Sequence, residues 1–361
     1  MSYIIGFLGV ILSLILVIGL HEAGHALSAR FFKVKIKRIS IGFGKPIFLK
    51  RSKTGIEWVW ARWPIGGYVK LLNTRIDPVS SELQPYCFDK KAIWKRVVIL
   101  LSGALANALV ALFALQGYYM IGHREITPVV AEVSIPSPAA KAGLGAGDRI
   151  LSINGQPTPS WRAVGMQFII LLDEANVPIL IQKPGGKTVQ MHLDLNQWEY
   201  SQQRNDLLQG LGIKPALSKR HINNIPGVSF FKAFYQAVVE IGAILYFFLI
   251  MLKQLFTGTI PFATLLGPIG LFSEMVISFL HGIAVYLFFI ANLSLAVGLV
   301  NLMPIPGLDG GSIVYALIEK IRGKPISVPL EILLHRLALI ILVVAMIQLL
   351  MNDLQRYLQQ L

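Results

Sequence analysis

Charge and cysteine are both scarce in this sequence. Only 14% of the 361 residues are charged, 54% are hydrophobic, and the mean hydropathy is +0.62. This composition excludes disordered, collagen-like and coiled-coil chains, and it is too apolar for an ordinary soluble protein. The single cysteine, Cys87, can form neither an intramolecular disulfide nor a cysteine zinc site. The sequence therefore predicts an integral membrane protein.

Four apolar runs are long enough to predict transmembrane helices. They are residues 4–29, 97–121, 283–303 and 333–352. No basic segment precedes the first run and no small-residue cleavage site follows it, which favours a span over a signal peptide. A fifth run, 231–252, carries Lys232, Gln236 and Glu240 at four-residue spacing. Hydropathy alone leaves open whether that run is a fifth span. The number of crossings that the candidate site below requires favours an amphipathic or partly inserted helix that lies on the periplasmic side and does not cross the membrane.

The distribution of basic residues predicts the orientation. Residues 30–96 contain 16 Lys and Arg against four acidic residues, so this loop is expected on the cytoplasmic side. Residues 123–220 contain 10 basic and eight acidic residues, and this nearly neutral segment is expected on the opposite side, with both termini. The formal charge of +14 thus indicates topology in a lipid bilayer, and no nucleic-acid partner is expected.

Residues 125–200 have the composition of a small β-rich domain. The string SPAAKAGLGAGDRILSING, from Ser137 to Gly155, resembles a circularly permuted bacterial PDZ domain. It predicts a short helix at 139–142, a turn at Gly147 and a strand that ends in the Asn154-Gly155 hairpin turn. The resemblance implies that a polypeptide binds in the PDZ groove by strand addition. A generic β-rich domain with the same turn residues is the alternative.

The sequence His21-Glu22-Ala23-Gly24-His25 is an H-E-x-x-H pattern. On a helix the two histidines share one face and can both bind a zinc ion, while Glu22 can take a proton from water at the metal. If the first span ends at Arg30, His21 lies about 13 Å deeper in the membrane at 1.5 Å per residue. Ionisable groups at that depth are costly unless they are paired or bind metal.

A catalytic zinc site needs a third protein ligand, and Asp309 is the leading candidate. It is the only acidic residue between Glu274 and Glu319. Pro304 and Pro306 are expected to end the preceding helix and leave Asp309 on backbone that can turn back towards a metal. His281 and His335 are weaker candidates, and a plain Asp-Gly turn at a membrane exit is the alternative without function.

These motifs in this order resemble the site-2 protease family of intramembrane zinc metallopeptidases. The features that carry this resemblance are H-E-x-x-H in the first span, N-x-x-P-x-x-x-L-D-G at 301–310, and a PDZ module between them. The bacterial regulator of sigma-E protease group is the more specific resemblance. It implies one zinc ion held by His21, His25 and Asp309, with Glu22 as general base. It also implies that Asn301 and Asn107 position the substrate chain.

Two features depart from the family pattern. Ala104 stands where the family usually has proline in the second span, so a kink there is not expected from the sequence. The enterobacterial members carry two tandem PDZ modules, whereas this chain has room for one.

A β-hairpin is expected in the loop 40–70, on the cytoplasmic side of the membrane. Residues 40–49 and 56–62 predict two strands around the turn 52–55, followed by the Gly66-Gly67 pair. Trp58 and Trp60 alternate in a way that suits a sheet at the membrane interface. A free hairpin edge could bind an unwound substrate, so Gly66 and Gly67 are predicted substrate-binding residues. The alternative is an interfacial anchor without substrate contact.

The sequence thus predicts a polytopic α-helical protein of the bacterial inner membrane, with four transmembrane helices, a membrane-associated β-hairpin and one periplasmic PDZ domain. The expected parts are a first half of the protease core (1–122), the PDZ domain (125–200) and a second half of the core (227–361). The expected function is cleavage of single-span membrane proteins of the anti-sigma-factor type, or of remnant signal peptides. A PDZ-bearing adaptor with a structural metal site is the alternative, and metal transport is a weaker one.

Overall fold

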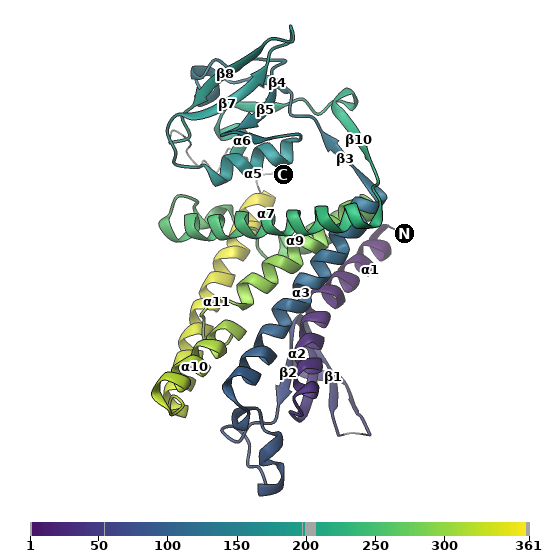
Figure 1. Ribbon diagram of the computed structural model, residues 1–361, viewed down its shortest axis with the longest axis vertical. Helices are drawn as coiled ribbons and strands as arrows, with labels where there is room; N and C mark the ends of the chain where they lie inside the picture. Colours follow the sequence, from purple (N-terminus) through teal and green to yellow (C-terminus); the bar gives the residue numbers. More distant parts are fainter. Residues whose placement is uncertain (1, 54, 197, 199–206, 359–361) are drawn as a thin grey trace. The chain divides into compact units, whose positions relative to one another are not determined.

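The computed structural model describes residues 2–53, 55–196, 198 and 207–358, and these form two compact units. The first, called the helical unit below, consists of Met1–Tyr118, Ala233–Ile241 and Leu266–Leu361. The second, called the β-rich unit, consists of Tyr119–Lys232 and Gly242–Leu265. Figure 1 gives the order of the elements along the chain.

The first long helix of the helical unit is continuous but changes its winding. It consists of α1 (Ser2–Leu14), a π-helical turn η1 (Ile15–Gly19) and α2 (Leu20–Phe31). Each π turn inserts an extra residue into the helical repeat, and such turns are common at functional sites. This one ends directly before the H-E-x-x-H pattern.

The other long helices follow the predicted spans with small shifts at their ends. They are α3 (Ile93–Ile121), α9 (Ile283–Asn301) and α11 (Val328–Leu358). Six helical segments among the described residues are long and apolar enough to cross a membrane. Besides the four predicted spans, these are α7 (Phe230–Thr257) and the segment Phe262–Leu280. The sequence pattern did not predict a helix over the second of these segments.

The segment Phe262–Leu280 contains a short turn, η5 (Phe262–Thr264), and the helix α8 (Pro268–Leu280). Small residues of α1 pack against α8, because a Cβ at Gly6 or Gly9 would meet Val276 or Phe279. Close packing of small residues is the usual way in which helices associate within a membrane. The Ser13 hydroxyl, 3.0 Å from Tyr286 Oη, adds a polar link between α1 and α9.

A buried carboxylate fixes the start of α8. Asp353 of α11 accepts hydrogen bonds from the main-chain N–H groups of Gly267 and Gly270, at 2.8 and 3.0 Å. These donors belong to the first turn of α8, where an acceptor from outside the helix satisfies otherwise unpaired N–H groups and the helix dipole favours negative charge. Asp353 therefore ties the end of α11 to the beginning of α8.

The predicted hairpin is a four-segment sheet made of two bent strands, β1 (Ile36–Arg51) and β2 (Glu57–Leu71). Residues 38–41 of β1 pair with residues 67–70 on one side and with 57–60 on the other, while residues 46–51 pair with 57–61. Both strands are longer than predicted because each one bends and pairs twice. Gly44 and Gly66, with φ of +92° and +89°, lie where the strands change direction.

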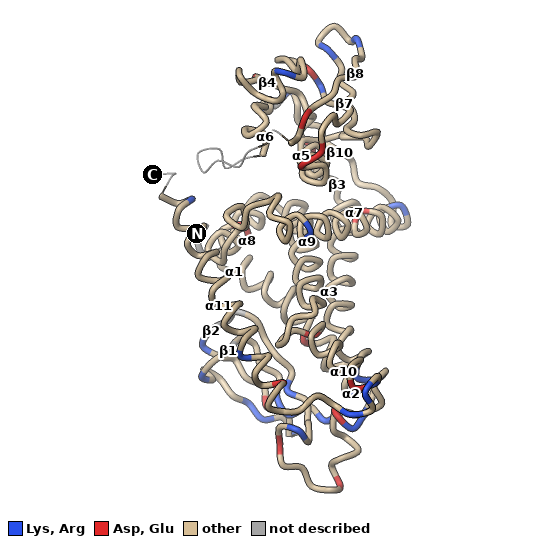
Figure 2. Tube along the Cα trace, turned by 90° about the vertical axis from the view of Figure 1, so that its left-hand side faces the viewer, with Lys and Arg blue, Asp and Glu red and all other residues tan. Residues whose placement is uncertain are grey.

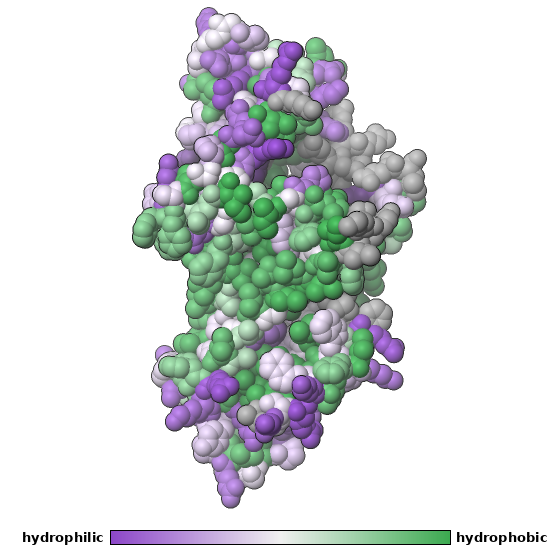
Figure 3. Space-filling view, turned by 90° about the vertical axis from the view of Figure 1, so that its right-hand side faces the viewer, coloured by the Kyte–Doolittle hydropathy of each residue, from purple (hydrophilic) through white to green (hydrophobic). Residues whose placement is uncertain are grey.

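Charged residues cluster at the end of the helical unit that carries the sheet. Figure 2 shows Lys and Arg along β1, β2 and the nearby helix α10 (Asp309–Arg322). On the face drawn in Figure 3, the helices of this unit present a broad apolar surface, with hydrophilic residues gathered at the lower end. This pattern matches the basic loop that the sequence places at a membrane surface.

Two short 3-10 helices, η2 (Ser81–Tyr86) and η3 (Phe88–Lys90), lead from the sheet to α3.

The β-rich unit is built on a sheet of order β6-β5-β7-β8, all antiparallel. Two further antiparallel pairs, β4-β9 and β3-β10, join segments that are distant in the sequence. The elements are β3 (Gly122–Ile126), β4 (Val130–Val133), α4 (Pro138–Lys141), β5 (Arg149–Ile153), β6 (Gln156–Pro157), α5 (Trp161–Ile170), β7 (Val177–Gln182), β8 (Thr188–Leu193), α6 (Leu207–Gly210), β9 (Ile213–Pro215), η4 (Lys219–His221) and β10 (Ile222–Pro226).

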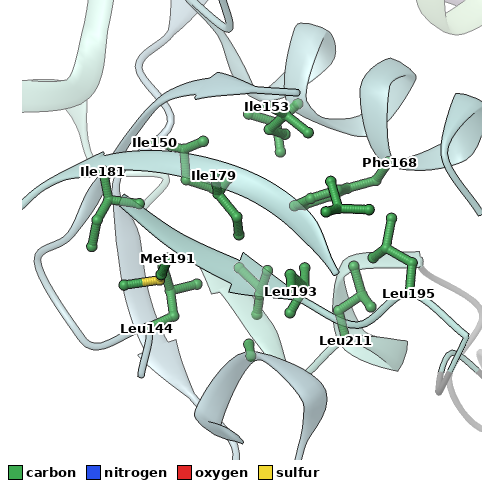
Figure 4. Packing of buried hydrophobic residues seen from close by; sticks show 14 of the residues in the cluster. Leu144, Ile150, Ile153, Phe168, Ile179, Ile181, Met191, Leu193, Leu195 and Leu211 are labelled. Atoms are coloured by element: carbon green, nitrogen blue, oxygen red, sulfur yellow. The ribbon is translucent and has the colours of Figure 1, made fainter. Parts of the chain in front are cut away.

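The core of this unit extends beyond the predicted domain boundary. Leu211 and Ile213 are buried in the same apolar cluster as Ile150 and Phe168, as Figure 4 shows for Leu211. The boundary predicted at residue 200 is therefore too early, because the late strand β9 pairs with β4 and completes the core. The predicted helix near 139–142 and the Asn154-Gly155 turn between β5 and β6 are present. Both turn residues have positive φ, as a tight hairpin requires.

Candidate metal centre

Three predicted ligands come together in the helical unit. Oδ2 of Asp309 lies 3.2 Å from Nε2 of His21 and 3.2 Å from Nε2 of His25, and the two Nε2 atoms are 3.2 Å apart. The two histidine side chains are buried, and the two rings meet edge to face with centroids 4.8 Å apart. Among the described residues, these three form the group whose geometry suits a metal ion.

The hydrogen bonding of His25 indicates which of its nitrogens can bind a metal. Nδ1 of His25 lies 2.8 Å from the carbonyl oxygen of Ile99, an acceptor, so Nδ1 carries the proton and Nε2 presents a lone pair. Without a cation, that lone pair would face the carboxylate oxygen of Asp309 at 3.2 Å. Two imidazole nitrogens and one carboxylate oxygen are donors that zinc commonly takes, and a carbonyl behind the ligating histidine is the usual orienting group. The residues therefore fit a zinc ion.

Close packing between α2 and α3 holds the two histidines in place. A Cβ on Gly24 would collide with the carbonyl oxygen of Ser102 on α3. A Cβ on Gly103 would lie 2.7 Å from Nε2 of His21 and still closer to Nε2 of His25. Glycine at both positions lets the helices approach so that the imidazole rings reach the space beside α3.

The backbone before α10 places Asp309 in the group. Helix α9 ends at Asn301, three residues before Pro304, and α10 begins at Asp309 itself. This agrees with the prediction that the prolines end the helix and return the aspartate towards the histidines. Gly310 and Gly311 allow the turn, because a Cβ on either would collide with main-chain oxygens of Leu302 or Ile305. A carboxylate in the first turn of α10 is also favoured by the helix dipole.

A partly buried ion pair links α10 to the helix that supports His25. Arg96, near the start of α3, donates to Glu319 of α10 at 2.8 Å and lies over the ring of Phe88. Ile99, whose carbonyl accepts from His25, is one turn further along α3. The pair therefore fixes α10, and with it Asp309, against the helix that orients the second histidine.

Glu22 lies beside the three ligands, next to the sheet. A Cβ on Gly67 would lie 3.1 Å from Cγ of Glu22 and 2.9 Å from the carbonyl oxygen of Ser40. The absence of a side chain at Gly67 thus lets β2 approach the face of α2 that carries Glu22. In an inner segment of the sheet, hydrogen bonds from Arg51 and Arg38 lower the pKa of Glu57. These bonds link the segment of Glu57 to the two segments that pair with it on either side.

The two predicted asparagines are placed differently. Asn107 is fully buried one turn after Gly103, and neither polar atom of its side chain has a hydrogen-bond partner. Its neighbours on α9 are Gly298, close to its Cβ, and Ser294, which donates to its carbonyl. Asn301 ends α9, and its amide donates to the carbonyl of Val297 in the same helix. Gly66 lines an apolar cavity next to the group.

The rival ligands lie outside the group. Nδ1 of His281 is 2.7 Å from the carbonyl oxygen of Ile277, and Nδ1 of His335 is 2.7 Å from that of Glu331. Each ring is therefore hydrogen-bonded to a backbone carbonyl group of the preceding helical turn. The contacts of Ile99, of Gly103 and of the Arg96–Glu319 pair were not predicted from the sequence. Only the four-residue spacing of Gly103 and Asn107 hinted that one face of α3 meets the site.

Together, the apolar helices and the His-His-Asp group with an adjacent glutamate form a candidate metallopeptidase site within a membrane protein. The model of peptidase family M50 matches residues 9–345, and the chain belongs to this family. It is a zinc metalloprotease of the site-2 type, and a multi-pass protein of the bacterial inner membrane.

Curated relatives match the chain over nearly its whole length. The regulator of sigma-E protease RseP of Escherichia coli is 28% identical, covering 99% of this chain and 100% of that protein. Protease RseP of Yersinia pestis is 27% identical, with 99% and 100% covered. A Pasteurella multocida protein whose name assigns it to the zinc metalloproteases is 26% identical, with the same coverage.

Proposed function

We propose that this protease cleaves the transmembrane segments of single-span proteins, with one zinc ion held by His21, His25 and Asp309. The observation that carries the proposal is the assembly of these three donors within 4.8 Å of one another, with Glu22 beside them. His21, Glu22 and His25 lie on a helix that is apolar enough to span a membrane. Ionisable groups at such depth are expensive and are expected to serve a function.

Each residue of the site has a chemical task in peptide hydrolysis. When bound, zinc lowers the pKa of a water molecule and polarises the scissile carbonyl. Glu22 takes the proton from the attacking water and passes it to the leaving amine. The Ile99 carbonyl holds His25 in the tautomer that binds the metal. Asn107 and Asn301 are proposed to position the substrate chain, since amide groups can bond to its exposed peptide groups.

The sheet is proposed to hold the substrate in an extended form. A transmembrane helix conceals its amides in internal hydrogen bonds, so the segment must unwind before hydrolysis. Residues 67–70 of β2 form an edge of the four-segment sheet, and this edge adjoins Glu22 at Gly67. Strand addition at such an edge satisfies the peptide groups of an unwound chain, which supports Gly66 and Gly67 as substrate-binding residues.

The adaptor alternative is less well supported. A purely structural zinc site is normally closed by four protein ligands, whereas catalytic sites use three and leave one position open. The group described here offers three donors, with a glutamate in the general-base position beside them. Three of the matched relatives are named as proteases, which points in the same direction.

The substrate class follows from these relatives by analogy. Proteins named as regulators of sigma-E protease suggest an anti-sigma factor with a single span as the substrate, and remnant signal peptides are a second class. The single β-rich unit is proposed to be a periplasmic PDZ domain that binds polypeptide. The alignment with the Escherichia coli protein spans 448 positions, so that protein has segments that this 361-residue chain lacks. This agrees with one such domain in place of two.

We further propose four membrane crossings, with the β-rich unit outside and the loop 30–96 inside. The two ends of α7 both belong to the β-rich unit, and Gln254 near its C-terminal end donates to the carbonyl of Ile169 on α5 at 2.7 Å. A helix that begins and ends at the same unit does not cross the membrane. Helix α8 has 13 residues and is about 20 Å long, shorter than the roughly 30 Å of the hydrocarbon core. It is proposed to enter the membrane without crossing it.

Accessibility labelling tests this topology. In a Cys87→Ala background, a Lys253→Cys variant should react with an impermeant thiol reagent added outside, while Lys320→Cys should react only after the membrane is opened. Both positions are exposed, so burial does not bias the comparison. The reverse pattern would mean that α7 crosses, and the proposed sidedness of the sheet and the β-rich unit would be wrong.

A reconstituted cleavage assay tests the proposed function itself. The purified chain in detergent micelles, mixed with a synthetic single-span substrate, should release two fragments. Removing zinc with a chelator should stop the reaction and adding zinc back should restore it, because the metal activates the water. Cleavage that persists without metal, or a zinc-loaded chain that never cleaves any single-span segment, would contradict the proposal.

A further inference from the structure

An apolar cavity of about 280 Å³ lies within the helical unit, and its lining reaches Ile18, one helical turn before the H-E-x-x-H pattern. Its walls come from the first long helix, β2, α8, α9 and α11, with Ile18, Gly66, Phe272, Leu293 and Val297 among the lining residues. The catalytic chemistry described above uses neither this space nor the side chains that surround it.

The cavity is lined by one proposed substrate-binding residue, Gly66, and by neighbours of others. Ile18 is four residues before Glu22 on the same helix, and a Cβ on Gly67 would lie 3.4 Å from Cγ2 of Ile18. Gly66 lines the cavity and is the neighbour of Gly67 on the sheet edge. Val297 is the residue whose carbonyl accepts from Asn301. A chain bound along the sheet edge would therefore pass the mouth of this cavity.

The size and the lining indicate what the cavity can hold. An engineered apolar cavity of about 150 Å³ is large enough to bind benzene, so about 280 Å³ accommodates one bulky aromatic or branched side chain. The polar side chain among the lining residues is Ser13, and its hydroxyl is already bonded to the carbonyl of Gly9. A charged or strongly polar group would lose its hydration there without gaining a partner.

We propose that this cavity is a specificity pocket that receives one bulky apolar side chain of the cleaved segment. The proposal rests on the proposed protease function. Side chains of an extended chain alternate between two faces, so a substrate paired with residues 67–70 presents every second side chain to the same side. The pocket lies N-terminal to the H-E-x-x-H motif along the first helix, away from the basic end at Arg30. It therefore selects a residue in the apolar part of the substrate segment.

A substrate series with Ala, Leu, Phe or Trp at successive positions of the segment tests the pocket. At one position relative to the cleaved bond, Phe or Leu should raise kcat/KM about tenfold or more over Ala, a typical value for filling an apolar pocket. Val297→Phe should fill the space and remove this preference, while Phe272→Ala should enlarge it and shift the preference towards Trp. Both residues line the cavity.

The matched control is Val285→Phe, the same change on an exposed part of α9. It should retain the preference of the unsubstituted chain. A flat profile over all substrate positions, or a Val297→Phe variant with unchanged preference, would overturn the assignment.

Crosslinking tests occupancy without requiring turnover. In a chain with Glu22→Gln and Cys87→Ala, a cysteine at Val297 should form a disulfide with a substrate cysteine at one position, and a cysteine at Val285 should not. If the unsubstituted chain cleaves no substrate and this crosslink still forms in the variant, the proposed protease function is wrong and the pocket assignment is supported. If the chain cleaves substrate but no position crosslinks, the space is filled by lipid chains and the pocket assignment fails.

Discussion

Replacing Glu22 by glutamine should abolish peptide cleavage while leaving zinc bound. The amide keeps the shape of the side chain but cannot take a proton from water, and removal of a general base typically lowers the rate by a factor of about 10² to 10⁴. The three donors that surround the metal position are untouched, since Glu22 is not among them. Zinc content by elemental analysis and kcat on a single-span substrate are the two measurements.

Asp309→Ala is the informative comparison for this experiment. It removes one of three donors and should lower zinc content as well as activity. An active Glu22→Gln variant would refute the assigned base. An Asp309→Ala variant that kept both zinc and activity would show that the third ligand is another residue.

Gly103→Ala should strongly weaken zinc binding. The added methyl group would occupy space within 2.7 Å of Nε2 of His21 and closer to Nε2 of His25, where the zinc position is bounded by the ligand atoms. Because the methyl is fixed to the backbone of α3, relief requires moving either the helix or both rings. We expect zinc content to fall by at least about tenfold, the lower end of what disturbed ligand orientation costs.

Gly242→Ala provides the control for this change, because a Cβ there meets nothing within 4 Å. It should bind zinc and cleave substrate normally. If the Gly103→Ala variant binds zinc with undiminished affinity, the two imidazole rings do not reach the metal in the way described above.

The parts of the site that the sequence could predict are those encoded locally. Two histidines four residues apart share a helix face whatever the fold, and prolines end a helix wherever they fall. His21, His25 and the return of the chain to Asp309 therefore follow from the pattern. The presence of a helix over each of the four predicted spans has the same origin, because length and apolar composition are local properties. The ends are less well predicted, since α11 begins five residues before the predicted span and ends six residues after it.

The remaining parts depend on contacts between distant segments. Ile99 is one of many apolar residues in its run, and its carbonyl matters only because α3 packs against α2. The double pairing of β1 with β2 depends on bends at glycines that a two-strand pattern does not reveal. Leu211 and Ile213 complete the core of the β-rich unit from beyond the expected boundary, after a segment that gives no strand signal. Helix α8 was overlooked because Gly267, Pro268 and Glu274 interrupt its apolar run.

The position of the cleaved bond tests the central claim most directly. A single-span substrate should be incubated with the zinc-loaded chain in lipid vesicles, and the new termini of both fragments identified by mass spectrometry. The account predicts one principal cut inside the apolar segment, lost in the Glu22→Gln variant. Cuts confined to the soluble flanks of the substrate, or a cut inside the segment that the Glu22→Gln variant still makes, would contradict it.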